Sequence, residues 1–318
     1  MKKQLAGLTV ALLLLSGCSE GEDSTEVTVG LTFTPNVQFA PAYVAAEEQL
    51  FTEAGVSAKL RHHGANESLF GALLDGTEDL VIAGADEAAV ARAGGADLVV
   101  VGPYYATHPT ALIARADAQV ASPADLRGKR IGIPGPYGEN YFALQHVLQE
   151  AGLNDSDVDV KHIGFTQVAA LATNEVDAVI GFANNEPVQA AAQGVEVTVL
   201  PLGERLPLVG ASLVTTERAL ASKGPQIRAA VAALALGRER TVHDPDLALR
   251  ATATYVPELA ASDAQEAAKR TLTQTLPLWA EVDYPVLAAK ETEMADFLAN
   301  IGAVEEASQV KGLFSLGE

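Results

Sequence analysis

Short apolar runs alternate with amphipathic segments between residues 27 and 102. A short apolar run bounded by polar or glycine residues is typical of a buried strand, and apolar side chains three and four positions apart are typical of a helix. This pattern predicts strands at 27–32, 58–61, 80–83 and 98–102. It predicts helices at 41–50 and at 87–93, and between them a further helix that begins after a capping Asn66. Strands and helices alternating at this rhythm indicate a mostly parallel sheet covered by helices.

The same rhythm restarts in the middle of the chain. Helices are predicted at 123–126, 139–151 and 166–173, and strands at 130–133 and 178–182. The segment Asp79-Leu80-Val81-Ile82 matches Asp177-Ala178-Val179-Ile180, and each copy follows an amphipathic helix. Two similar α/β lobes are therefore predicted.

The last third of the chain is rich in helix formers. Strands at 195–200 and 212–215 precede helices at 226–242, 245–255, 263–275 and 285–300. Because no glycine- or serine-rich linker separates the lobes, we expect crossings on short segments near 112–115 and 208–212. Lobe 1 then comprises 27–112 plus 210–318, and lobe 2 comprises 113–209. Two crossings form a hinge, and two lobes on a hinge enclose a cleft.

The first eighteen residues are typical of an export signal. Lys2 and Lys3 precede an apolar run at 5–15, which leads into Leu15-Ser16-Gly17-Cys18. This is the layout of a secretory signal peptide, and the run is too short to span a bilayer. The last four residues resemble the lipobox of bacterial lipoproteins. We expect 1–17 to be a signal peptide, Cys18 to be lipidated and 18–26 to be a tether; the alternative is a plain signal peptide with an incidental cysteine.

Composition narrows the classes of function. The chain has 21 Lys and Arg residues against 41 Asp and Glu residues, a net charge of −20. So acidic a surface repels phosphate backbones and anionic lipids, which excludes nucleic-acid binding and leaves membrane contact to the lipid anchor. A single cysteine rules out a disulfide framework and a thiolate metal site, and the six histidines show no ligand spacing. We expect no metal ion and no cofactor.

Candidate ligand contacts lie in the loops that follow the predicted strands, where open α/β sheets bind ligands at helix N-termini. These loops carry amides, phenols and rings but no Lys or Arg, which favours a neutral or weakly polar ring system over a sulfonate or phosphate. Each such side chain has a structural alternative as a cap or a core residue, and Phe182 and Tyr105 are expected only to pack the lobes. The candidates are Asn36, Gln38, Phe39, Asn66, Asp86, Tyr104, Tyr137, Tyr141, Asn184, Asn185 and Glu186.

Several segments carry a family resemblance. They include Thr34-Pro35-Asn36 with Ala40-Pro41-Ala42-Tyr43-Val44-Ala45, and Asp125-Leu126-Arg127-Gly128-Lys129-Arg130-Ile131-Gly132. With the lipobox and the two lobes, they resemble the substrate-binding lipoproteins of bacterial ABC importers, in the branch of the sulfonate, taurine and nitrate binders and the pyrimidine-precursor binder ThiY. The riboflavin-binding members called RibY are more similar still in Ile131-Gly132-Ile133-Pro134-Gly135 with Tyr137-Gly138 and Tyr141, and in Asn184-Asn185-Glu186-Pro187.

The resemblance spans roughly residues 27–304. It implies a type II periplasmic-binding-protein-like fold of two α/β lobes that close over a ligand, with lobe 1 formed by both chain ends. Asn36 and Gln38 match the loop that contacts ligand from lobe 1, and Tyr137, Tyr141 and residues 184–186 match the contacts from lobe 2. ThiY-like members have an aromatic residue directly before Pro-Asn, where this chain has Thr34.

The sequence thus predicts a monomeric binding protein, held by its lipid on the outer face of the cell membrane or facing the periplasm. It would deliver a riboflavin-like heteroaromatic vitamin or precursor to ABC permease subunits. The alternatives are a thiamine pyrimidine precursor, a small sulfonate or nitrate-type solute, and a sensor lipoprotein without a transporter. No enzyme and no catalytic residue are expected, because the pyrimidine synthases that resemble this fold use a Cys-rich motif and a sacrificed His, and no Cys accompanies His62-His63, His108 or His146.

Overall fold

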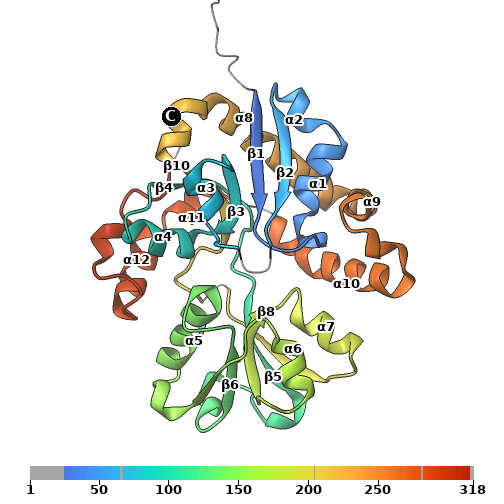
Figure 1. Cartoon of the computed structure of the whole chain (residues 1–318). Coiled ribbons are helices and arrows are strands. Elements are labelled where there is room, and N and C mark those ends of the chain that lie inside the picture. The colour runs from blue at the N-terminus through green and yellow to red at the C-terminus, as the bar shows by residue number, and fades with distance from the viewer. Residues whose placement is uncertain (1–24, 65–66, 204, 281, 316–318) are drawn as a thin grey trace, which may run out of the picture.

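The first lobe is built on a five-stranded sheet in the order β2-β1-β3-β10-β4 (Figure 1). The computed structural model describes residues 25–64, 67–203, 205–280 and 282–315. β1 pairs in parallel with β2 and β3, whereas β10 runs antiparallel to β3 and β4. The strands are β1 (Glu26–Leu31), β2 (Ser57–His62), β3 (Leu80–Gly84), β4 (Leu98–Pro103) and β10 (Ala211–Thr216).

The second lobe repeats this plan with a sheet in the order β7-β6-β8-β5-β9. β6 is parallel to β7 and β8, and β5 is antiparallel to β8 and β9. The sequence echo between 79–82 and 177–180 falls on β3 and β8, the third strand of each sheet. The strands are β5 (Thr110–Arg115), β6 (Arg130–Ile133), β7 (Asp159–His162), β8 (Ala178–Phe182) and β9 (Val197–Pro201).

Each antiparallel strand is the first strand that the chain enters after crossing between the lobes. The parallel strands end at the cleft, so a chain that arrives from the other lobe runs in the opposite direction. The prediction of a crossing near 112–115 is therefore wrong, because these residues belong to β5. The chain crosses between Pro103 and Thr110. A lobe boundary at 112 would divide a buried strand. β4 and β5 follow one another without a helix, which breaks the alternation behind that prediction. The return crossing joins Pro201 to Ala211.

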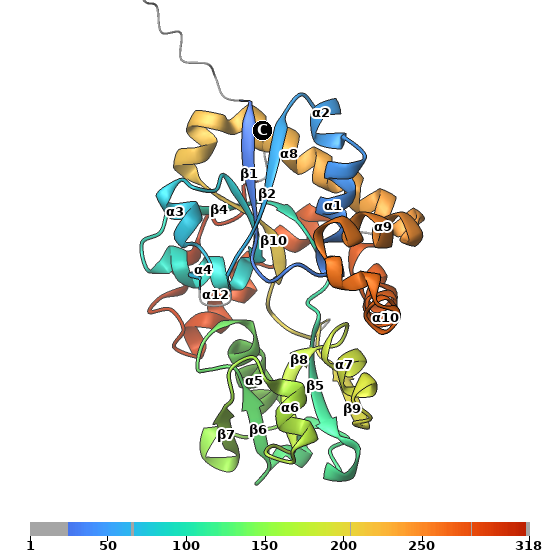
Figure 2. The same cartoon turned by 45° about the vertical axis from the view of Figure 1, so that its right-hand side comes forward.

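Helices cover both faces of each sheet (Figures 1 and 2). In the first lobe, α1, α2, α8, α9 and α10 share one hydrophobic cluster, and α3, α4, α11 and α12 share another. Within the described residues, no helix combines the length and the apolar composition of a membrane span. The α-helices are α1 (Ala40–Glu47), α2 (Leu50–Glu53), α3 (Gly71–Asp75), α4 (Ala85–Ala93), α5 (Gly138–Glu150), α6 (Gln167–Ala172), α7 (Glu186–Ala192), α8 (Glu217–His243), α9 (Pro245–Tyr255), α10 (Ser262–Trp279), α11 (Tyr284–Ala288) and α12 (Glu291–Asn300).

Short 3-10 helices complete the chain. They are η1 (Val37–Phe39), η2 (Ala116–Ala118), η3 (Pro123–Leu126), η4 (Asp155–Asp157), η5 (Pro257–Ala260) and η6 (Ala307–Val310). Several predicted bounds need correction. Residues 285–300 form two helices, because α11 packs on β4 while α12 packs on α4 and η6. The predicted helix at 226–242 is the later part of α8, which bends at Lys223. The helix expected after Asn66 begins at Gly71, and Asn66 lies outside the described residues.

α1 and α8 meet at Gly237. A Cβ built on Gly237 would lie 2.2 Å from the carbonyl oxygen of Pro41 and 3.0 Å from Cβ of Ala45. Between these two residues on α1, the fully buried Tyr43 stacks on Tyr255 of α9 with 4.3 Å between ring centroids. α1 begins directly after a loop that lines the cleft, so this close helix contact sets the position of that loop.

We expect Gly237→Ala to lower the free energy of unfolding by about 1–3 kcal/mol, since the added methyl group meets backbone that cannot move away. Alanine is the better helix former by about 1 kcal/mol, so any loss reports the clash between α1 and α8. Urea unfolding measures the change. Leu236→Ala, at a position 46% exposed on the same helix, is the control and should change stability by less than about 0.5 kcal/mol. A Gly237→Ala variant as stable as its parent would contradict this packing.

Candidate functional site

A cavity of about 590 Å³ lies between the lobes, a size typical of small-molecule pockets. The first lobe contributes the loop after β1, the start of α4 and the residues after β4. The second lobe contributes the residues after β6, β7 and β8. The cavity therefore lies at the carboxyl ends of the parallel strands, as in other open α/β sheets.

The loop after β1 is held in shape by its own hydrogen bonds. The side chain of Asn36 accepts from the backbone N–H of Gln38 at 2.8 Å and donates to the carbonyl of Thr34 at 2.8 Å. The hydroxyl of Tyr104 donates to the carbonyl of Gln38 at 2.8 Å, and the ring of Phe39 packs edge-on against His62. The predicted candidates Asn36, Gln38, Phe39 and Tyr104 all line the cavity.

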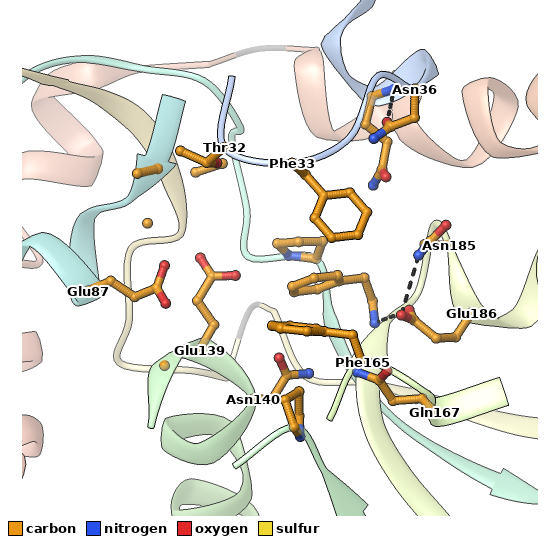
Figure 3. A pocket seen from close by; sticks show the side chains of 18 of the residues that line it. Thr32, Phe33, Asn36, Glu87, Glu139, Asn140, Phe165, Gln167, Asn185 and Glu186 are labelled. Carbon is orange, nitrogen blue, oxygen red and sulfur yellow. Dashed lines mark hydrogen bonds between the residues drawn. The ribbon is translucent and has the colours of Figure 1, made fainter. Parts of the chain in front are cut away.

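Two phenylalanines from opposite lobes meet edge-on in the cavity (Figure 3). Phe33 follows β1 and is 50% exposed, and Phe165 follows β7 and is 66% exposed. Their centroids lie 6.4 Å apart at an interplanar angle of 61°. Large rings this exposed inside a cleft leave much of their apolar surface in contact with solvent, so their exposed faces are available to a planar ligand. The predicted Tyr137, 61% exposed, lines the same cavity.

Amide and carboxyl groups line one side of the cavity (Figure 3). Nε2 of Gln189 donates to Oδ1 of Asn185 at 2.9 Å, and Nδ2 of Asn185 donates to Glu186 at 3.3 Å. Glu186 also accepts from the backbone N–H of Phe182 at 2.7 Å, and burial raises the pKa of its carboxyl. Gln167, at the start of α6, completes this polar wall, which offers both donors and acceptors.

Acidic groups lie on the other side. Glu87 from α4 and Glu139 from α5 point toward one another from opposite lobes (Figure 3). Behind them, Oδ2 of Asp86 lies 3.2 Å from Nε2 of His108, which is 3.9 Å from Oε1 of Glu139. Ligand atoms of Asp86, His108 and Glu139 lie within 4.8 Å of one another. These atoms already meet each other in polar contacts, so the spacing alone assigns no metal ion.

No lysine, arginine or histidine is among the described residues that line the cavity, whereas Glu87, Glu139 and Glu186 are. An anionic ligand would face three carboxyl groups and no counter-charge. Without a cationic partner among these lining residues, the electrostatics favour a neutral or cationic ligand.

Three predicted candidates lie outside the lining of the cavity. Tyr141 is two residues beyond Glu139 on α5, a rotation of roughly 200° that turns it to the hydrophobic core beside Phe142. Asn184 is buried and donates to Oγ1 of Thr275 at 2.9 Å, a bond between the lobes. Asp86 is fully buried behind the cavity wall. Asn66, like the lipidation candidate Cys18, lies outside the described residues.

Several lining residues were not predicted. Phe165 was missed because β7 has the sequence DVKH, which lacks the apolar run of a buried strand. Glu87 and Glu139 were passed over although each lies in the first turn of a helix after a strand, the position that could have revealed them. Phe182 and Tyr105, expected only to pack the lobes, also line the cavity.

Comparisons with known proteins show the family and the fold of this chain. Residues 36–248 match the family described as NMT1/THI5 like. The riboflavin-binding protein RibY of Chloroflexus aurantiacus is 34% identical over 256 residues, which cover 80% of this chain and 73% of that protein. The formylaminopyrimidine-binding protein of Halalkalibacterium halodurans is 25% identical over 260 residues, covering 79% and 78% of the two chains.

A solved structure shows the same architecture. The alkanesulfonate-binding protein SsuA of Xanthomonas axonopodis pv. citri, bound to MOPS, superposes with a TM-score of 0.71 at 21% identity. The match covers 92% of this chain and 98% of that one, and it confirms the predicted fold. The chain belongs to the NMT1/THI5-like family and has the two-lobed, type II fold of periplasmic binding proteins.

Proposed function

We propose that this protein is the extracytoplasmic binding subunit of an ABC importer and that it captures a riboflavin-like heteroaromatic vitamin. The observation that carries the proposal is the interlobe cavity in which Phe33 and Phe165 present exposed rings between an amide wall and an acidic wall. A planar ring system gains about 0.5–1.5 kcal/mol per aromatic contact beyond area burial. Amides can exchange paired hydrogen bonds with ring carbonyl and imide groups.

The lining supports a flavin over the alternatives. A sulfonate or nitrate would meet Glu87, Glu139 and Glu186 with no cationic partner among the described lining residues. A single pyrimidine ring would leave much of a cavity of about 590 Å³ unfilled. Three fused rings against the exposed faces of the phenylalanines, with a polyol chain beside the carboxyl groups, would contact both the aromatic and the acidic parts of the cavity. The 34% identity to RibY supports the same ligand class.

The proposed mechanism is closure and involves no bond making. Ligand bound by one lobe adds contacts to the other lobe only in the closed form, and the difference in affinity between the two forms sets the population shift. A closed, ligand-loaded monomer would then be presented to the permease subunits. A thiamine pyrimidine precursor remains the second candidate, supported by the similarity to the formylaminopyrimidine-binding protein.

The aromatic pair gives the sharpest test. We expect riboflavin to bind at one site per chain, and Phe165→Ala to weaken the binding at least about tenfold, or about 1.4 kcal/mol, because one ring face is lost. Phe33→Ala should have a similar effect. Isothermal calorimetry measures the affinities, and riboflavin emission reports burial of the ring.

Tyr141→Ala is the matched control, because this tyrosine lies on the same lobe but faces the hydrophobic core. It should keep the parental affinity. Flavin mononucleotide, which adds a dianionic phosphate, should bind much more weakly than riboflavin. Heat with an aminopyrimidine and none with riboflavin would overturn the flavin proposal, and tight binding of a sulfonate would overturn both ring-system proposals.

We also propose that Cys18 carries the lipid that holds the protein at the outer face of the membrane. The support is the Leu15-Ser16-Gly17-Cys18 sequence after a short apolar run. Cys18→Ala should move the protein from the membrane fraction to the soluble exported or unprocessed fraction, because the acylated thiol is gone. Immunoblots of fractionated cells measure the distribution. Unchanged membrane partitioning would rule out the anchor.

A further inference from the structure

Three carboxyl groups from two lobes converge at one edge of the cleft. Asp86 and Glu87 lie in the first turn of α4, and Glu139 lies in the first turn of α5. A Cβ built on Gly84 would lie 2.5 Å from Oδ1 of Asp86, 2.5 Å from Oε1 of Glu139 and 3.1 Å from Oε2 of Glu87. Across the lobe boundary, a Cβ built on Gly138 would lie 2.8 Å from Oε1 of Glu87. The three groups therefore form one acidic cluster, made of Asp86, Glu87 and Glu139.

Little positive charge faces this acidic cluster. Within the described residues, His108 is the ion-pair partner of Asp86 and Glu139, and no ion pair involves Glu87. Two other groups interact electrostatically with this region. The charge of Glu139 contributes to the raised pKa of Tyr105, and the charge of Lys290 contributes to the lowered pKa of His108. Burial lowers the pKa of His108, an effect that Glu139 opposes and Lys290 strengthens, so burial works against a positive charge on this imidazole. The helix N-termini of α4 and α5 supply only partial positive charge.

Burial without a counter-charge favours the protonated carboxyl. Burial raises the pKa of Asp86 to about 7. Burial and the charge of Asp86 raise the pKa of Glu87 to about 8. The pKa of Glu139 is raised well above its usual range by burial and by Asp86 and Glu87. In the closed cleft the acidic cluster thus retains protons that isolated carboxyl groups in water would release.

Opening the cleft would separate Glu139, on the second lobe, from Asp86 and Glu87 on the first, and would admit water to all three. We propose that closure of the cleft takes up protons at the acidic cluster, so that ligand capture strengthens as the solution becomes more acidic and weakens as it becomes alkaline. This inference rests on the proposed closure around a ligand. It would make release of the ligand sensitive to the pH outside the membrane.

The direction follows from linkage. The pKa values are higher in the closed form than in the open form, so closure is most favourable below the open-form pKa values of ordinary carboxyl groups. The advantage is lost as the pH rises through the closed-form values of about 7 for Asp86 and about 8 for Glu87. We expect the Kd for riboflavin to rise about a hundredfold or more between pH 6 and pH 8, with about two protons taken up per ligand at pH 7.

The full chain is titrated with riboflavin by calorimetry in buffers of different ionisation enthalpy, which yields the number of protons taken up. EDTA in every buffer removes any divalent ion from the acidic cluster. Glu139→Gln and Glu87→Gln keep the side-chain size but remove the titrating group, and each should lower the number of protons taken up by about one and weaken the pH dependence of Kd accordingly. Glu53→Gln is the control: Glu53 is exposed on α2 and is not among the described residues that line the cavity, and the variant should keep the parental pH dependence.

A ligand-free measurement separates this inference from the identity of the ligand. Small-angle scattering should show a smaller radius of gyration at about pH 5.5 than at about pH 8.5, and Glu139→Gln should reduce the difference. If riboflavin gives no heat at any pH, the proposed ligand is wrong and the scattering result still decides on proton-linked closure. A pH-independent radius of gyration in the parent, or an unchanged pH dependence in both glutamine variants, would overturn the inference.

Discussion

The fourth strand of each five-stranded sheet is one that arrives from the other lobe. β10 hydrogen-bonds between β3 and β4, and β5 hydrogen-bonds between β8 and β9. The two crossings are also tied to each other, since the backbone N–H groups of Tyr104 and Tyr105 both donate to the carbonyl of Ala211, at 3.1 and 3.0 Å. Each crossing is thus anchored in a buried sheet at both ends. Relative motion of the lobes is confined to two short segments beside the cleft.

The cleft chemistry follows from this arrangement. All the parallel strands end at the same gap, so the loops after β1, β3, β6, β7 and β8 supply its walls. Aromatic faces come from Phe33 and Phe165, amides from the start of α7, and carboxyl groups from the first turns of α4 and α5. The fold is shared with the sulfonate binder SsuA, but the side chains on these loops differ in charge from those that an anion requires. The ligand is therefore decided by the loops and not by the lobes.

Much of the architecture could be predicted from the residues alone. Buried strands such as β3 and β8 are apolar runs with no polar interruption, and amphipathic helices such as α5 show one apolar stripe, so local pattern suffices to locate them. The echo between 79–82 and 177–180 indicated the repeated lobes, and the family segments indicated the binding-protein fold. Most of the loop candidates at strand ends, including Asn36, Tyr137 and Glu186, proved to line the cavity.

Tertiary structure decided what local pattern cannot contain. β7 and β5 are strands because neighbours hydrogen-bond to them; DVKH has no strand pattern of its own, and β5 follows β4 without the expected helix. The helical rotation that turns Tyr141 away from the cavity and Glu139 toward it depends on how α5 packs. The convergence of Asp86, Glu87 and Glu139 depends on two helices from different lobes, separated by some fifty residues in the sequence. Charge proximity of this kind arises only from the fold, because sequence spacing carries no information about which helix ends will face each other across a cleft.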